Sequence, residues 1–417
     1  MAWARFGLLG DRRFVQLLLM TLAIGAAVYA RFSLGPLQEA LRTDMGLSDD
    51  QVALVQGPAI ALPMAIGAIP LGLVVNRVPR HLLFGLALAL AMSGGFLSAA
   101  AGGLELLLAA RCLTGVALSV ITIAAYAAVG DLYPPEQRGR ATMLVALGEV
   151  GGAPLAFAVG GVILDARGLG AAGWREALLI MTAGLSAAAI SMLALRSGTE
   201  ATEAPLAASA RRLFAELWRH RGLVAPLLLA RVVLWVADGA VLVWGAPTLS
   251  RRFGLSASEV GASMGAVLLI SGLVGPLLGG PLADFFQRRG GARSTMRALA
   301  AMAGLSVPAA MFAFAPTPLI AVIALGVFLC LGYMIGTAAL TLATVVIPAP
   351  LRPLYLAISV TLVAVFFIGA APVAVSGLAD LMGGPGSIGS ALSLVCAAAS
   401  VAGTAVLLAS ARGFPGR

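Results

Sequence analysis

The feature that most constrains this chain is a series of apolar runs that recurs along all 417 residues. Each run is about 20 residues long, the length that an α-helix needs to cross a bilayer. Charged residues make up only 11% of the sequence, against about 25% in soluble globular proteins. A transmembrane β-barrel would show short alternating strands instead. The sequence therefore predicts an all-α polytopic membrane protein.

Twelve transmembrane helices are predicted in two six-helix bundles. Their approximate ranges are 14–38, 51–75, 82–101, 105–129, 141–164, 174–195, 223–248, 257–283, 294–314, 317–343, 353–377 and 386–410. The first run is too long for a signal-peptide core, so we interpret it as the first span. The predicted domains are an N-terminal bundle (1–195), a cytoplasmic linker with an amphipathic helix (196–222) and a C-terminal bundle (223–417).

An internal duplication relates the two halves. Gly46-Leu47-Ser48 recurs 208 positions later as Gly254-Leu255-Ser256. The same offset relates three further pairs: Gly72 and Gly280, Asn76 and Asp284, Arg80 and Arg288. Farther along, the offset drifts to 214 and then 218, which we attribute to loops of changed length. The chain thus contains two pseudo-repeats.

The arginines indicate the orientation. One set of loops holds 19 of them and the other set holds five, and basic residues favour the cytoplasmic side. Both termini and the 196–221 stretch are therefore predicted to be cytoplasmic, in a bacterial cytoplasmic (inner) membrane. The basic residues lie in short loops between spans, so the net charge of +9 does not indicate nucleic-acid binding.

Several motifs resemble those of the major facilitator superfamily. Gly72-x-x-x-Asn76-Arg77-x-x-Arg80 is similar to the family's loop between spans 2 and 3, although the family usually has Asp where this chain has Asn76. Three further motifs are similar to family motifs in spans 4, 5 and 6: Arg111-x-x-x-Gly115, Gly148-x-x-Gly151-Gly152-Ala153-Pro154 and Gly173-Trp174-Arg175. The resemblance implies the major facilitator fold and transport by alternating access.

Within that superfamily, the chain resembles spinster-like transporters. The similar stretches are Tyr29-Ala30-Arg31, Gly46–Gln51, Ala110-Arg111, Ala124–Tyr126 and Asp131–Glu136. Spinster-like chains tend to carry an acid where this chain has Ala30, and a glutamate where it has Leu118. The resemblance implies lipid-like cargo, and the two departures remove the acids that would carry protons by the family's route.

Arg31 and Arg111 are the candidate substrate-binding residues. Both are predicted in the outer half of their spans, and an ionisable residue inside a membrane is a functional candidate. A guanidinium binds carboxylate or phosphate as a bidentate fork. Tyr29 and Tyr126 are assigned to the same site. The alternative is that an arginine braces the spans through backbone carbonyls.

Asp238 and Glu149 are the candidate proton carriers. Asp238 lies 208 positions after Ala30, so it occupies the position of the missing acid in the second repeat. Its alternative role is a structural pair with Arg231 or another span. Glu149 has the alternative role of a salt bridge to the loop between spans 2 and 3.

The remaining charged residues near the loops form a predicted gate on the cytoplasmic side. Its members are Asn76, Arg77, Arg80, Asp131, Arg138, Asp284 and Arg288. Gate contacts that form and break give two states of similar energy, which a substrate can bias. Glycines of the fifth span are predicted to pack on the eighth span.

The predicted function is secondary active transport of a small organic or amphipathic anion, including lipid-like anions, coupled to protons. The alternatives are a broad-specificity drug or metabolite exporter, an uncoupled facilitator, and a membrane receptor or sensor. No nucleophile elbow, zinc motif or Walker loop is present. We therefore expect no enzyme activity, cofactor, metal or nucleic acid, and a monomer in the bilayer.

Overall fold

The computed structural model describes residues 12–74, 78–133, 135–166, 171–191, 218–219, 221–348, 351, 355, 358–359 and 361–413. The chain divides into two compact units. Unit 1 comprises Met1–Glu203 with Ser256–Gly265, and unit 2 comprises Ala204–Leu255 with Ala266–Arg417. The linker was predicted to contain an amphipathic helix, and the part of the linker up to residue 217 lies outside the described residues.

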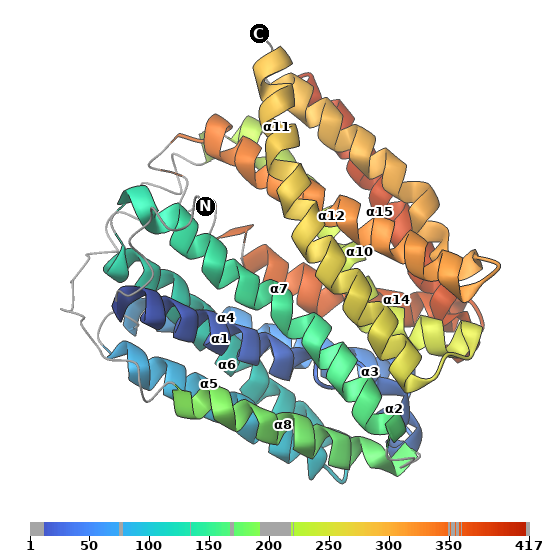
Figure 1. Ribbon diagram of the computed structural model, residues 1–417. Helices are drawn as coiled ribbons and strands as arrows, with labels where there is room; N and C mark the ends of the chain where they lie inside the picture. Colours follow the sequence, from blue (N-terminus) through green and yellow to red (C-terminus); the bar gives the residue numbers. More distant parts are fainter. Residues whose placement is uncertain are drawn as a thin grey trace. The chain divides into compact units, whose positions relative to one another are not determined.

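Unit 1 is built from helices, which Figure 1 shows in blue to green. They are α1 (Arg12–Phe32), α2 (Gln38–Met45), α3 (Asp49–Gln56), α4 (Pro58–Val74), α5 (Arg80–Ala99), α6 (Leu104–Leu132), α7 (Pro135–Ala166), η2 (Ala171–Gly173) and α8 (Trp174–Ser191). The pairs α1–α7, α5–α6 and α4–α6 share the most extensive packing within the unit.

Unit 2 is also helical in its described residues. Its elements are α10 (Arg221–Phe253), α11 (Ala257–Ala310, of which the residues up to Gly265 belong to unit 1), η4 (Met311–Phe314), α12 (Pro318–Val346), the π-helix η6 (Val363–Ala370), α14 (Ala371–Leu381), η7 (Pro385–Ser387) and α15 (Ile388–Ala411). Helix α10 packs mainly on α15. The fully buried Trp244 of α10 donates its indole N–H to the carbonyl oxygen of Pro372 in α14 (2.9 Å).

The twelve predicted spans correspond to these helices. Ten described stretches are long and apolar enough to cross a membrane. One of them, Ala257–Phe314, is 58 residues long and contains two spans, because Gly290 and Gly291 leave helical geometry (φ −152° and 66°). The 18-residue α8 supplies the remaining span. The chain is a multi-pass membrane protein.

Two predicted span boundaries differ from the structure. The first span ends at Phe32 rather than near residue 38, and a turn separates it from α2. The second span begins at Asp49 and is interrupted at Gly57, where α3 ends and α4 begins with Pro58. Proline has no N–H to continue the hydrogen-bond ladder of a helix, so the interruption falls there.

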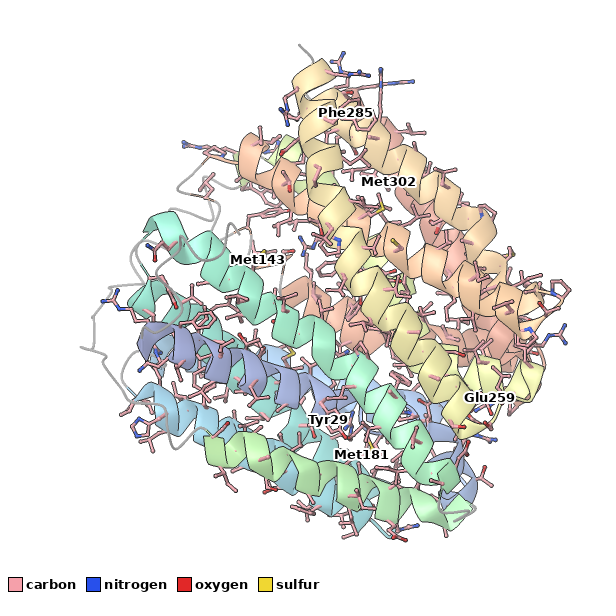
Figure 2. The ribbon with its side chains drawn as sticks, in the orientation of Figure 1. Tyr29, Met143, Met181, Glu259, Phe285 and Met302 are labelled. Carbon is pink, nitrogen blue, oxygen red and sulfur yellow. The ribbon has the colours of Figure 1, made fainter. Side chains whose placement is uncertain are left out.

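The duplicated segments adopt the same local structure. Gly46 and Gly254 both have a left-handed backbone (φ 63° and 68°), which glycine adopts at little cost. The serine two residues later caps the next helix in both copies. Ser48 exchanges two hydrogen bonds with Gln51 (2.9 and 3.2 Å), and Ser256 does the same with Glu259 (2.8 and 3.3 Å). Figure 2 shows Glu259 at the start of α11.

Small residues allow α1 and α7 to pack closely. A side-chain carbon added at Gly152 would lie 2.5 Å from the carbonyl oxygen of Gly25 in α1, and one at Gly148 would collide with the Thr21 carbonyl. The helix in contact with Gly148 and Gly152 is therefore α1, whereas the sequence predicted the eighth span. That prediction holds for Gly161, which lies against Ala257 and Gly261 at the start of α11, in the part that belongs to unit 1. Close backbone approach through small residues is common in membrane helices.

The Gly-Trp-Arg motif at the start of α8 ties this helix to its neighbours. The buried Trp174 indole donates to Asp44 Oδ2 (3.0 Å). Arg175 forms an ion pair with the same carboxylate and donates to the Ala101 carbonyl (3.0 Å). The hydrogen bonds that Trp174 and Arg175 donate to this carboxylate hold the pKa of Asp44 below its usual value, and the bond from Trp174 has the larger effect.

We predict that Gly152→Val destabilises the protein while Gly151→Val is tolerated. The added carbons at position 152 overlap α1, and overpacking costs about 1–3 kcal/mol. No atom lies within 4 Å of a carbon added at Gly151. Thermal unfolding of the purified variants measures the difference, and equal midpoints would show that the α1–α7 crossing adapts to the larger side chain.

We predict that Asp44→Asn lowers the thermal midpoint at pH 7 and that the deficit shrinks in acid. Because the pKa of Asp44 is lowered in the folded protein, its stabilising contribution is present above the ordinary carboxyl value of about 3.9. It is lost as the pH falls through the lower, folded-state value. Asp50→Asn, an exposed carboxylate of the next helix, is the matched control. A deficit independent of pH would contradict the prediction.

Candidate substrate and proton sites

Arg111 on α6 is the most deeply buried cation of unit 1 among the described residues, with 2% of its surface exposed. Its Nη2 donates to the backbone carbonyl of Arg31 in α1 (2.6 Å) and to Gln56 Oε1 in α3 (3.2 Å). Gln56 donates in turn to Gln38 Oε1 in α2 (3.2 Å). The interruption at Gly57 ends α3 at the glutamine that contacts Arg111.

Part of this polar cluster has no partner within the described part of the chain. The Arg111 Nε and the Gln38 Nε2 are buried and form no hydrogen bond. No carboxylate pairs with Arg111 in that part of the structure. A buried donor without a partner costs about 1–3 kcal/mol, so an anion that accepted these N–H groups would recover that cost.

Arg31 lies at the end of α1, next to Arg111. Its half-buried guanidinium lies 4.6 Å from the ring centroid of Phe32. The two arginine charges are close enough to repel each other. The structure thus brings the two predicted arginines together, and it also shows Arg111 bracing α1 through a backbone carbonyl, which is the alternative role weighed from the sequence.

The two predicted tyrosines lie in different surroundings. Tyr29 is buried in α1 with 8% exposed, and Figure 2 shows it among the helices of unit 1. Tyr126 on α6 is 39% exposed and donates its hydroxyl to Glu149 Oε1 on α7 (3.1 Å). Glu149 therefore has a hydrogen-bond partner inside unit 1. Of the arginines in the loop between spans 2 and 3, Arg77 lies outside the described residues, so the alternative salt bridge stays a prediction.

The predicted gate is only partly described. Asn76 and Arg77 lie outside the described residues, and nothing is described of the side chains of Asp131 and Arg138. Arg80 begins α5 and is 6% exposed. Asp284 and Arg288 are exposed on α11, where the Arg288 Nε donates to the Asp284 carbonyl (3.4 Å). The gate network stays a prediction.

Asp238 on α10 is 7% exposed. Its carboxylate lies against Gly332 of α12, where an added side-chain carbon would be 2.5 Å from Oδ1. The buried Cys396 of α15 contacts the neighbouring Ala237 carbonyl (3.8 Å). In the described part of the chain, no cation or hydrogen-bond donor pairs with this carboxylate. An isolated buried carboxylate is costly in its ionised form.

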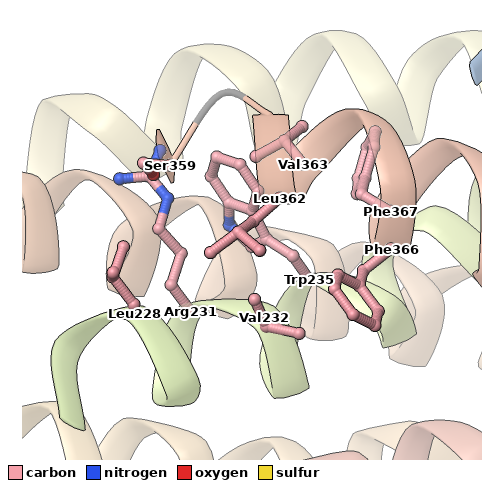
Figure 3. Close-up of a pocket in the computed structure, with 9 residues that line it drawn as sticks. All are labelled: Leu228, Arg231, Val232, Trp235, Ser359, Leu362, Val363, Phe366 and Phe367. Atoms are coloured by element: carbon pink, nitrogen blue, oxygen red, sulfur yellow. The ribbon is translucent and has the colours of Figure 1, made fainter. Parts of the chain in front are cut away.

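Arg231 does not pair with Asp238, although the two lie on the same helix. Its guanidinium stacks on Trp235 (3.9 Å to the ring centroid) and hydrogen-bonds the Tyr355 hydroxyl. This arginine lines a pocket between α10 and the segment that enters η6, shown in Figure 3. Trp235 is not among the residues predicted from the sequence, although an aromatic residue four positions after an arginine shares its helix face.

Comparisons with known proteins agree with this architecture. A family model described as the Major Facilitator Superfamily matches residues 20–371. A bacterial homolog to the human lysosomal transporter Spinster, solved inward-facing and unoccupied, has a TM-score of 0.77 at 21% identity, with 97% of this chain and 98% of that chain covered. A D-xylose–proton symporter has a TM-score of 0.69 at 16% identity, covering 94% and 97%. No curated protein sequence matches.

Two helical units with repeated segments and intramembrane charges define a multi-pass protein of the transporter class. The chain belongs to the Major Facilitator Superfamily, whose model matches most of its length. The predicted family and its twelve-helix fold are confirmed. Members of this family are transporters, so the family assignment agrees with the prediction that the protein is not an enzyme. The likeness to the spinster homolog confirms a spinster-like fold.

Proposed function

We propose that this protein is a secondary active transporter that moves a small organic or amphipathic anion, including lipid-like anions, by rocker-switch alternating access coupled to protons. The observation that carries the proposal is the buried Arg111 beside Arg31, without a carboxylate partner for Arg111 in the described chain. The lipid-like part of this class rests on the resemblance of the sequence to spinster-like transporters.

The proposed organisation follows the sequence prediction. Bundles over 1–195 and 223–417 move relative to each other about the 196–222 linker, in a monomer. Both termini lie in the cytoplasm and the protein lies in a bacterial inner membrane, as the arginine distribution favours. The gate residues Asp284 and Arg288, exposed on α11, form and break contacts between the two states.

Asp238 is the proposed proton carrier of unit 2. The elements packed on α10 are α12, α14, α15, η4 and η6, and the titratable group that they bring near this carboxylate is the Cys396 thiol. Protonation removes a charge whose burial is costly, and release of the proton restores it. Glu149, which pairs with Tyr126, is the second candidate carrier.

We predict that Arg31→Gln lowers the affinity for the transported anion by about tenfold or more, because a hydrogen bond to a charged group contributes about 1.5–3 kcal/mol. The measurement is thermal stabilisation of the purified protein by a panel of organic anions, fatty acids and lysolipids at pH 6 and 8. Arg111→Gln is tested in parallel.

The matched control for these substitutions is Arg252→Gln, an exposed arginine at the end of α10. An Arg31→Gln variant with an unchanged midpoint in the absence of ligand separates anion binding from bracing of the spans. Stabilisation by ligand that survives both substitutions would instead favour a broad-specificity exporter whose cavity does not depend on arginine.

We predict that Asp238→Asn abolishes accumulation driven by a proton gradient while exchange of substrate without a gradient continues. The amide fills the same space beside Gly332 but carries no exchangeable charge. Uptake into liposomes with and without an imposed pH gradient measures both activities, and Glu149→Gln is the comparison variant. Loss of accumulation in Glu149→Gln alone would move the proton site to α7, and loss in neither would indicate an uncoupled facilitator.

A further inference from the structure

We propose that the pocket around Arg231 is a second binding subsite, within unit 2, for the oxyanion head group of an amphipathic molecule. The proposal rests on the proposed transport of amphipathic anions and adds a site that lies apart from the pair Arg31 and Arg111. Nine residues line the pocket in Figure 3: Leu228, Arg231, Val232, Trp235, Ser359, Leu362, Val363, Phe366 and Phe367.

The polar side of the pocket offers donors without partners. The Nε and Nη1 atoms of Arg231 and the Ser359 Oγ are buried and form no hydrogen bond with the described residues. Ser359 is 2% exposed. A cationic fork beside a hydroxyl fits a carboxylate or a phosphate, because these groups accept several hydrogen bonds at once. The unpaired donors therefore specify an oxyanion.

Aromatic contacts hold the guanidinium in place. Trp235 stacks on it at 3.9 Å and lies 5.9 Å from Phe367, centroid to centroid. Gly239 of α10 lies directly against the Phe367 carbonyl, so that a side chain at this glycine would collide with the backbone of η6. This close contact fixes the spacing of the two segments that form the pocket, so the donors are pre-organised for a ligand.

The remaining walls of the pocket are apolar and the pocket is small. Leucine, valine and phenylalanine side chains line the rest of the pocket, and Figure 3 shows Phe366 and Phe367 at the end away from the Arg231 guanidinium. The enclosed cavity is about 10 Å³, close to the room that one water molecule needs, so it admits one oxygen of an oxyanion and not a whole ligand. An oxyanion oxygen therefore reaches the donors of Arg231 and Ser359, while the rest of the head group and the chain extend out through the mouth.

Arg231 is not a copy of an arginine in the first repeat. The residue 208 positions earlier is Ala23, and the residues 208 positions after Arg31 and Arg111 are Gly239 and Leu319. Each unit thus acquired its own intramembrane arginine. An anion-binding role in unit 2 accounts for retaining a costly charge that has unpaired donors.

The test uses the fluorescence of Trp235 as a local reporter. The full-length protein is placed in phosphatidylcholine nanodiscs and titrated with dodecanoate brominated near the carboxylate, which quenches a tryptophan only at short range. The quenching component that Trp235→Phe removes is the signal of the pocket. Dodecanol with the same bromination is the neutral control for partition into the bilayer.

The expected result is saturable quenching of Trp235 by the brominated dodecanoate. Arg231→Gln is expected to weaken it about tenfold or more, and Ser359→Ala to weaken it less. Arg252→Gln leaves it unchanged. Competition by dodecyl phosphate but not by inorganic phosphate indicates a lipid-like head group with its chain, whereas competition by inorganic phosphate alone indicates a free-anion site and overturns the amphipathic assignment.

The proposal is overturned if brominated dodecanol quenches Trp235 as strongly as the acid, or if Arg231→Gln leaves the titration unchanged. Should Arg231→Gln fold poorly, Val363→Trp is the second variant, because it fills the pocket and keeps the arginine. Its binding of unbrominated dodecanoate is measured directly. Weaker binding than in the unchanged protein supports the subsite, and equal binding overturns it. Transport that depends on Arg31 while Trp235 shows no such site would reject this subsite and leave the proposed function standing.

Discussion

The structure depends on one constraint, which is that a chain inside a bilayer must satisfy its backbone hydrogen bonds internally. Helices meet this requirement, and each interruption of a helix is resolved locally. At Gly57 the N–H donates back to the Ala53 carbonyl (2.9 Å) and a proline follows. The hydrophobic effect does not drive helices together inside a lipid bilayer, because the lipid tails are themselves apolar. Close packing through glycines such as Gly148 and Gly152 therefore contributes much of the contact between α1 and α7.

Against that apolar background the buried charges are few and their surroundings differ. Arg111 is held by a carbonyl and a glutamine, and Arg231 by an aromatic ring and a tyrosine. Both retain donors without partners in the described chain. Asp238 is buried beside Gly332, and no described cation pairs with it. Each arrangement leaves an ionisable group without a described partner of opposite charge, which is the property on which the proposed roles in binding and proton exchange depend.

Much of the fold follows from the sequence, because membrane-length apolar runs and a constant repeat offset are properties of single segments. The capping boxes at Ser48 and Ser256 were implicit in the repeated motif. The contacts within the candidate sites could not be predicted from the sequence in the same way. Nothing in the local pattern links Gln56 to Arg111, 55 positions apart, or Tyr126 to Glu149, because such pairs depend on which faces of different helices meet.

The π-helix η6 changes how the drifting repeat offset is understood. The offset grows by four residues between Arg352 and Ala371, and η6 lies within this interval. Because a π-turn contains one residue more than an α-turn, part of the extra chain is taken up inside the span and not in a loop. In the first repeat this region carries Gly148 and Gly152, and in the second it carries Phe366 and Phe367. A short insertion within a helix therefore gave the two halves of a duplicated protein different side chains at the same place in the span: glycines that let two helices pack closely in one half, and phenylalanines that line a pocket in the other.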